Sequence, residues 1–111
     1  MNKTGYISDP FYLKHKNEPH PENPGRLNAI QKNIESSKYY NNLILIQPRK
    51  ATVEDIAKVH DKGYIQSVEE NCKNGVRNLD ADTVISTDSY EAALLSAGAG
   101  LEAVDKILEG T

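Results

Sequence analysis

Four aliphatic residues, Leu43 to Ile46, follow one another without a polar interruption near the middle of the chain. A run this short predicts a β-strand, and its lack of alternation is typical of a strand buried on both faces, as in parallel sheets. A second β-type run at 4–8 lies upstream and ends at Asp9-Pro10, because proline has no N–H for strand pairing. With a helical pattern between them, the two strands predict a βαβ unit and therefore an α/β fold.

The segment between the two predicted strands divides into a loop and a helix. Residues 12–25 contain three prolines between positions 19 and 24, which forces extended or turn geometry. We expect an ordered loop there, the kind of segment on which functional sites are often built. From Arg26, apolar residues recur at three- and four-residue spacing on one face, and this spacing predicts a helix that ends near Ser37.

Two further helices are predicted after the second strand. Thr52 can cap a helix over 53–59, whose first turn carries acidic residues where the positive end of the helix dipole favours them. Apolar residues then recur every four positions from Tyr64 to Cys72, and Gly75 fits the end of that helix.

The longest predicted helix closes the chain, after an extended or looped segment at 78–86. Asp88 with Glu91 three residues later resembles a capping box. A face of alanines with Gly98 would let this helix pack closely on a sheet. The helix is expected to end at Gly110, where a further strand would be expected to follow, so we expect the chain to be truncated.

The composition sets broad limits on function. The 111 residues are 38% apolar and 26% charged, which is sufficient for one small core. The net charge of −3 and the scattering of the 13 Lys and Arg residues provide no positive field for a phosphate backbone, so we expect no direct nucleic-acid binding. No stretch approaches the roughly 20 apolar residues of a membrane span or resembles a signal peptide. The lone Cys72 excludes an internal disulfide and predicts a buried thiol, so these features together indicate a cytoplasmic protein.

Few residues stand in a recognisable catalytic pattern. The three histidines show neither helical i, i+4 spacing nor an Asp-x-His arrangement, so no metal site is predicted from this chain alone. Asp80 and Asp82 would project to one face of an extended segment, either as a carboxylate pair that accepts hydrogen bonds from ligand N–H groups or as caps of local backbone N–H groups. Arg26 would clamp a carboxylate or cap a cavity, or it would stand as a solvated arginine at a helix start.

Four blocks of sequence are more specific in their order than any of them alone. They are His20-Pro-Glu-Asn-Pro-Gly-Arg-Leu27 with Ala29-Ile30, Ala51-Thr-Val-Glu-Asp-Ile56 with Val59-His-Asp61 and Tyr64-Ile65, Leu79-Asp-Ala-Asp-Thr83, and Ser89-Tyr-Glu-Ala-Ala-Leu94 with Ala97-Gly98. In this order the blocks closely resemble the start of the histone deacetylase family, in its class II, acetoin-utilisation and acetylpolyamine amidohydrolase branch. The resemblance covers nearly the whole chain.

The resemblance implies the N-terminal part of the arginase-deacetylase three-layer fold, with a mostly parallel sheet. Residues 1–111 would be a segment of a single deacetylase domain, truncated before its zinc-binding part. In that family a zinc-bound water attacks an acetyl-amide carbonyl. The resemblance therefore implies a zinc-dependent parent that hydrolyses acetyl-lysine or an acetylated amine. It places every catalytic residue and every zinc ligand beyond Thr111, so this chain alone is expected to be inactive.

The resemblance also implies roles for individual residues of this chain. Asp82 matches the loop aspartate that accepts hydrogen bonds from the substrate's backbone amides at the pocket rim. His20 and Pro21 match the first loop that lines the pocket mouth. Arg26 matches an arginine at the inner end of the acetyl pocket. The match of Asp80 is weaker, because its family counterpart varies.

A stand-alone, non-catalytic binding or interaction module derived from the same fold is the alternative. That alternative predicts a natural stop near Thr111 and a chain that folds cooperatively on its own. A truncated domain would instead leave a strand edge and an apolar face uncovered, which would favour association, including a homo-oligomer. The sequence leaves open which acylated substrate is used and whether the parent has a potassium site.

Overall fold

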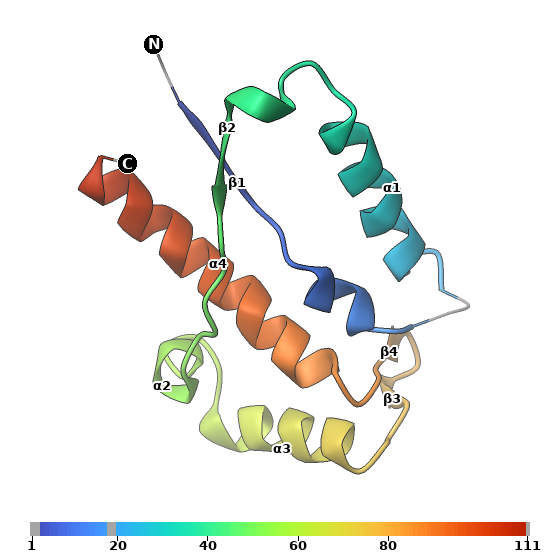
Figure 1. The fold of residues 1–111 in the computed structure, drawn as a ribbon. Helices are drawn as coiled ribbons and strands as arrows, with labels where there is room; N and C mark the ends of the chain where they lie inside the picture. The colour runs from blue at the N-terminus through green and yellow to red at the C-terminus, as the bar shows by residue number, and fades with distance from the viewer. Residues whose placement is uncertain (1–2, 18–19, 111) are drawn as a thin grey trace.

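The computed structural model describes residues 3–17 and 20–110. Pro19 and Thr111, which entered the predictions above, lie outside these residues. The described elements follow one another in the order β1, η1, α1, η2, β2, α2, α3, β3, β4 and α4, where η marks a 3₁₀-helix (Figure 1).

The first strand and the central aliphatic run pair in parallel. β1 (Thr4–Ile7) lies beside β2 (Leu43–Ile46) in the register Thr4 to Leu43 and Ile7 to Ile46. The helix α1 (Pro24–Glu35) lies on the connection between them, as a parallel pair requires (Figure 1). The prediction of a βαβ unit and an α/β fold is therefore confirmed.

The helix α1 begins two residues before the predicted start at Arg26. Asn23 caps it by accepting a 2.8 Å hydrogen bond from the N–H of Gly25, and Pro24 takes the first helical position. Proline suits that position because its fixed φ matches the helix and its missing N–H would have no partner there.

The expectation that β2 is buried on both faces is wrong for this chain. Leu45 is 59% exposed, whereas its strand neighbours are only partly exposed. β1 is the one strand that pairs with β2 among residues 3–17 and 20–110, so the other edge of β2 has no strand partner there. The apolar run thus has the composition of a central strand in a larger sheet.

The first part of the proline-rich loop is helical rather than looped. The 3₁₀-helix η1 (Pro10–Lys14) follows β1 directly. Asp9 caps it by accepting a 2.8 Å hydrogen bond from the N–H of Phe11. A capping aspartate followed by proline is a helix-start signal, and it overrides the extended reading of this segment.

The middle of the chain keeps its predicted caps, but the helix predicted over 53–59 is shorter than expected and gives way to a turn at 57–59. A second 3₁₀-helix, η2 (Tyr40–Asn42), leads into β2. The predicted cap at Thr52 forms a full capping box with Asp55 at the start of the short helix α2 (Val53–Ile56). The next helix, α3 (Lys62–Lys73), is followed by Gly75 at a φ of 77°, a conformation in which glycine is not strained.

The segment at 78–86 contains a small hairpin. β3 (Asn78–Asp80) pairs antiparallel with β4 (Thr83–Val84), and the hairpin leads directly into α4 (Ser89–Glu109). The predicted end of α4 at Gly110 is confirmed, because this residue has a φ of 77° and its N–H donates back to Ile107.

The predicted capping box of Asp88 does not form. Asp88 precedes α4, but its side chain makes no capping hydrogen bond, and its backbone is already helical, with φ −94° and ψ 0°. The Ser89 hydroxyl oxygen instead accepts the N–H of Ser86 at 2.8 Å. This bond closes the turn at residues 86–89. An extended Asp88, as a capping box requires, would break that turn.

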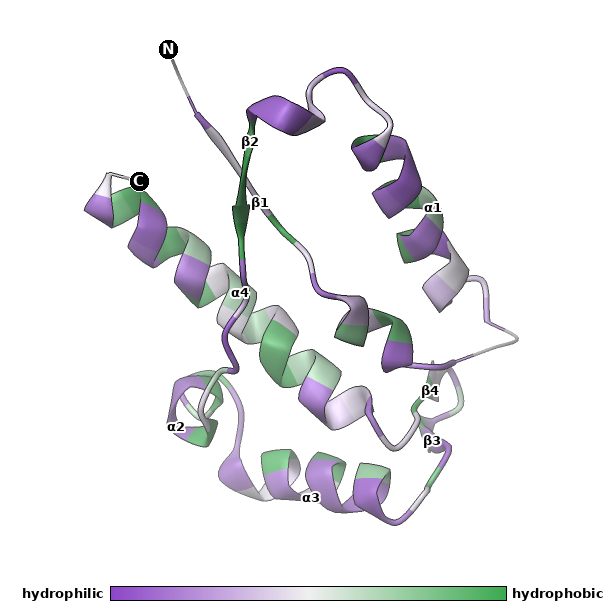
Figure 2. Cartoon of the chain, in the orientation of Figure 1, coloured by the Kyte–Doolittle hydropathy of each residue, from purple (hydrophilic) through white to green (hydrophobic). Residues whose placement is uncertain are grey.

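The predicted close packing of α4 at Gly98 is confirmed, but its partner is the segment after β2 and not a strand. The Ala51 N–H donates a 2.9 Å hydrogen bond to the carbonyl of Leu94, and a Cβ on Gly98 would lie 1.6 Å from the Arg49 carbonyl oxygen. Figure 2 shows apolar residues recurring along α4 and over β2. The buried apolar side chains of the described residues are Ala51, Ile65, Cys72, Ile85 and Ala92.

Candidate functional site

Two segments that are far apart in the sequence meet beside the start of α4. One is the loop between η1 and α1, and the other is the β3–β4 hairpin (Figure 1). Three of the residues singled out in the sequence, His20, Pro21 and Asp82, lie on these two segments. The fold therefore brings them to one end of the molecule.

His20 and Asp82 are in direct contact. The Nε2 atom of His20 lies 3.0 Å from Oδ1 of Asp82, across 62 positions of sequence. The His20 side chain is 24% exposed and that of Asp82 is 91% exposed. The other ring nitrogen of His20, Nδ1, accepts a 3.0 Å hydrogen bond from the N–H of Glu22.

Asp80 and Asp82 do not act together as a carboxylate pair. The Asp80 carboxylate accepts the N–H of Asp82 at 2.9 Å, so it caps local backbone within the hairpin turn. This backbone hydrogen bond, with another from the hydroxyl of Thr83, holds the pKa of Asp80 below its ordinary value. The local-capping alternative therefore describes Asp80, while the Asp82 carboxylate points to a different partner.

Arg26 lies in the first turn of α1 and pairs with the carboxylate of Glu22, four residues before it. Its side chain is 53% exposed. The structure thus shows an exposed ion pair between Arg26 and Glu22, which lies on the same loop as His20 and Pro21, and the role of Arg26 toward a ligand or cavity stays a prediction.

Two asparagines that the sequence analysis did not single out shape this loop. The buried side chain of Asn17 donates to the carbonyl of Glu22, and the backbone carbonyl of Asn17 accepts the N–H of His20 at 3.0 Å. Asn23 donates from its side chain to the carbonyl of His20 at 2.9 Å. Their position around a proline-rich turn was the available signal, because asparagine side chains readily bond to nearby backbone.

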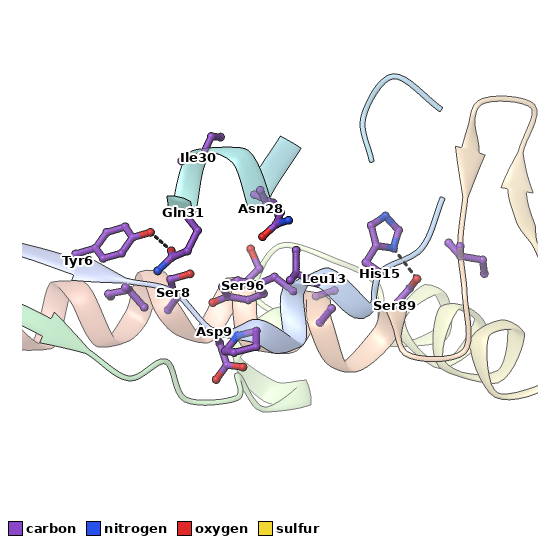
Figure 3. A pocket seen from close by; sticks show the side chains of 18 of the residues that line it. Tyr6, Ser8, Asp9, Leu13, His15, Asn28, Ile30, Gln31, Ser89 and Ser96 are labelled. Carbon is purple, nitrogen blue, oxygen red and sulfur yellow. Dashed lines mark hydrogen bonds between the residues drawn. The ribbon is translucent and has the colours of Figure 1, made fainter. Parts of the chain in front are cut away.

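A second set of contacts, at the base of this region, joins residues 14–16 to Ser86 and Ser89 at the start of α4. Nδ1 of His15 lies 2.6 Å from the hydroxyl of Ser89 (Figure 3). The hydroxyl of Ser86 donates to the carbonyl of Lys14 at 2.9 Å and accepts the N–H of Lys16 at 3.0 Å. Burial lowers the pKa of His15, which favours its neutral form. We call these five residues the base network.

Next to the base network lies a cavity of about 920 Å³ between η1, α1 and α4 (Figure 3). Most of its wall is apolar and includes Leu13, Leu27, Ile30 and Ile85. Polar groups interrupt it where the hydroxyl of Tyr6 donates to Gln31 and where His15 meets Ser89. Arg26 does not contribute to its lining.

The described residues do not form a zinc site by themselves. Within residues 3–17 and 20–110, no three His, Cys, Asp or Glu side chains lie together in an arrangement that would hold a metal ion. Cys72, a buried free thiol as predicted, has a pKa raised by that burial, which makes it a poor metal ligand and nucleophile. No helix in these same ranges is long and apolar enough to cross a bilayer.

The fold has a counterpart among solved structures. It matches a crystal structure of the HDA15 HD domain with a TM-score of 0.88 and 24% sequence identity, over 98% of this chain and 33% of that one. The deacetylase-type α/β fold predicted from the sequence is therefore confirmed.

The family follows from the sequence of the chain. Residues 20–111 match the model of the histone deacetylase domain, and the chain belongs to that family. It is 33% identical to a probable deacetylase of Archaeoglobus fulgidus and 35% identical to one of Methanothermobacter thermautotrophicus, over 95% and 92% of this chain. It spans only 30% of the length of each of these relatives.

Proposed function

We propose that this chain is the N-terminal segment of a single zinc-dependent deacetylase domain, and that it contributes the loops at the rim of the substrate pocket. The parent would hydrolyse the acetyl amide of acetyl-lysine or of an acetylated amine. Family membership and the share of its relatives that the chain spans support this proposal. Any zinc ion would be held by residues outside this segment.

Within this proposal, Asp82 is the residue that holds the substrate. Its carboxylate is exposed at the end of the hairpin turn, and the backbone beneath it is fixed because Asp80 accepts its N–H. A carboxylate can accept hydrogen bonds from the amide N–H groups that flank an acetylated side chain. The observation that carries the proposal is the contact of Asp82 with His20, because it unites the hairpin with the loop assigned to the pocket mouth.

The other proposed site residues lie on that loop or directly after it. His20 and Pro21 would line the pocket mouth, and Arg26 would serve the inner end of the acetyl pocket. Glu22 holds the guanidinium of Arg26 in the first turn of α1. We further propose that the parent is cytoplasmic and acts on acetylated substrates without binding nucleic acid directly.

The proposal is tested by replacing Asp82 in the full-length protein that carries this segment. Asp82→Ala removes hydrogen bonds to a charged acceptor, each of which contributes about 1.5–3 kcal/mol. We therefore expect kcat/KM for an acetyl-lysine peptide to fall roughly 10- to 100-fold. Asp88→Ala is the matched control, because Asp88 makes no side-chain capping bond and its loss should leave kcat/KM unchanged. Equal effects of the two variants would contradict the proposed role.

One observation favours a second function, that of a non-catalytic binding module. The His20–Asp82 contact is made entirely within this chain, so an amide ligand would have an acceptor here without any metal. In that case the chain alone should bind an acetyl-lysine peptide, and Asp82→Ala should abolish the binding. Isothermal titration calorimetry with the unacetylated peptide as control distinguishes this function from the first.

A further inference from the structure

We infer that His20 is a positioning residue that fixes the carboxylate of Asp82 for substrate binding. This inference rests on the role proposed above for Asp82 and adds a specific task for its neighbour. The two residues touch at 3.0 Å, and the question is which of them orients the other.

The hydrogen bonds of His20 determine where its proton lies. Because Nδ1 accepts the N–H of Glu22 at 3.0 Å, the neutral ring carries its proton on Nε2. That Nε2–H is directed at Oδ1 of Asp82. The neutral imidazole therefore already has the tautomer that donates to the carboxylate.

Several hydrogen bonds fix the backbone and the ring of His20, whereas the Asp82 side chain is much less constrained. The N–H of His20 donates to Asn17, its carbonyl accepts from the Asn23 side chain, and its ring is tied to Glu22. The Asp82 side chain is 91% exposed, and His20 is its one hydrogen-bond partner among the described residues. Because His20 is fixed and the Asp82 side chain is otherwise free to rotate, His20 orients the Asp82 carboxylate.

This arrangement divides the work of the two carboxylate oxygens. Oδ1 of Asp82 takes the imidazole N–H, which stops free rotation of the side chain. The second oxygen stays available as an acceptor for a substrate N–H. Pre-ordering an acceptor lowers the entropy lost on binding, so the gain appears in substrate affinity.

The contact should matter little for stability. Exposed pairs of this kind contribute a median of about 0–1 kcal/mol. Removing the imidazole should therefore leave the fold intact and weaken substrate binding by up to about five-fold, the affinity equivalent of about 1 kcal/mol.

The test compares His20→Ala, His20→Gln and His60→Ala in the full-length protein with an acetyl-lysine peptide. We expect His20→Ala to raise KM by roughly two- to five-fold with kcat unchanged. His20→Gln should restore KM, because its amide places an N–H donor where imidazole has Nε2–H. His60→Ala removes an exposed histidine that stacks on Tyr64 and should change neither parameter. An unchanged KM in His20→Ala, or no recovery in His20→Gln, would overturn the inference.

Two further measurements separate this inference from the proposed function. In an Asp82→Ala background, His20→Ala should have no additional effect on KM, and an additive effect would show that His20 acts independently. If Asp82→Ala itself leaves kcat/KM unchanged, the proposed function fails first. The ¹⁵N chemical shifts of His20 test the geometry without any substrate, because an Nδ1–H tautomer would refute the positioning role whatever the activity.

Discussion

The contact of α4 with the segment after β2 leaves no room for a side chain at Gly98. A Cβ there would lie 1.6 Å from the carbonyl oxygen of Arg49, 2.6 Å from its carbonyl carbon and 2.8 Å from the nitrogen of Ala51. All three are backbone atoms, so no side-chain rotation relieves the overlap. Since ordinary contact begins at 3.4 Å, the helix would have to move about 1.8 Å, the difference between this limit and the shortest distance.

The energetic cost of Gly98→Ala follows from that displacement. Overpacking of this kind typically costs about 1–3 kcal/mol and occasionally more. The shift would also break the 2.9 Å hydrogen bond from Ala51 to Leu94, worth about 1 kcal/mol. Alanine returns about 1 kcal/mol through its higher helix propensity. We expect a net loss of about 1–3 kcal/mol, a substantial part of the roughly 5–15 kcal/mol that stabilises a typical domain.

The same helix provides a matched control two residues further on. A Cβ on Gly100 would meet nothing within 4 Å, so Gly100→Ala gains helix propensity without a clash. It should stabilise the protein by about 0.5–1 kcal/mol. Urea unfolding followed by circular dichroism measures both free energies. The two variants should change stability in opposite directions and differ by about 1.5–4 kcal/mol. Equal stability of the two variants would refute the close packing of α4 on residues 49–51.

Two further predictions concern pH and the acetyl pocket. Burial holds the pKa of His15 below its ordinary 6.5, so the unfolded chain binds the proton more readily than the folded one. Stability should therefore be fully present above pH 6.5 and decline as the pH falls below it toward the folded pKa, and His15→Asn should reduce this part of the decline in urea unfolding at a series of pH values. Arg26→Ala should slow deacetylation in the full-length protein while the zinc content, measured by atomic absorption, stays the same. Loss of the metal would instead show that Arg26 has a structural role.

Local elements of this fold could be read from the sequence because their signals are local. Thr52 and Asp55 satisfy each other's backbone within one turn, so the capping box needs nothing from the rest of the chain. Asp88 and Glu91 have equivalent spacing, yet no box forms. The turn before α4 is instead held by the hydrogen bond from the N–H of Ser86 to the hydroxyl of Ser89. That hydroxyl is also in contact with His15, which lies 74 positions away. The same motif thus succeeded or failed according to its tertiary partners.

The candidate site could be predicted only through resemblance, because its contacts are long-range. Spacing alone allowed Asp80 and Asp82 to be a carboxylate pair, and nothing local indicated that Asp82 would turn to His20. The base network was missed for the same reason. Its histidine and serines carry no motif of their own, and they acquire a role only when η1 and the start of α4 are brought together.

The base network and the His20–Asp82 contact differ in what a substitution would change. Substitutions in the first should affect the fold, and substitutions in the second should affect ligand binding. At the base, Ser89 is buried and Ser86 bonds to the backbone of Lys14 and Lys16, so a change there would shift both segments together. At the tip of the β3–β4 hairpin, the Asp82 carboxylate is exposed and contacts the imidazole of His20. A change at His20 would therefore affect only the orientation of that carboxylate. If the segment serves as the proposed pocket rim, its exposed recognition residues could vary at little cost to stability. Substrate preference within the family would then be expected to change at the tip while the base stays constant.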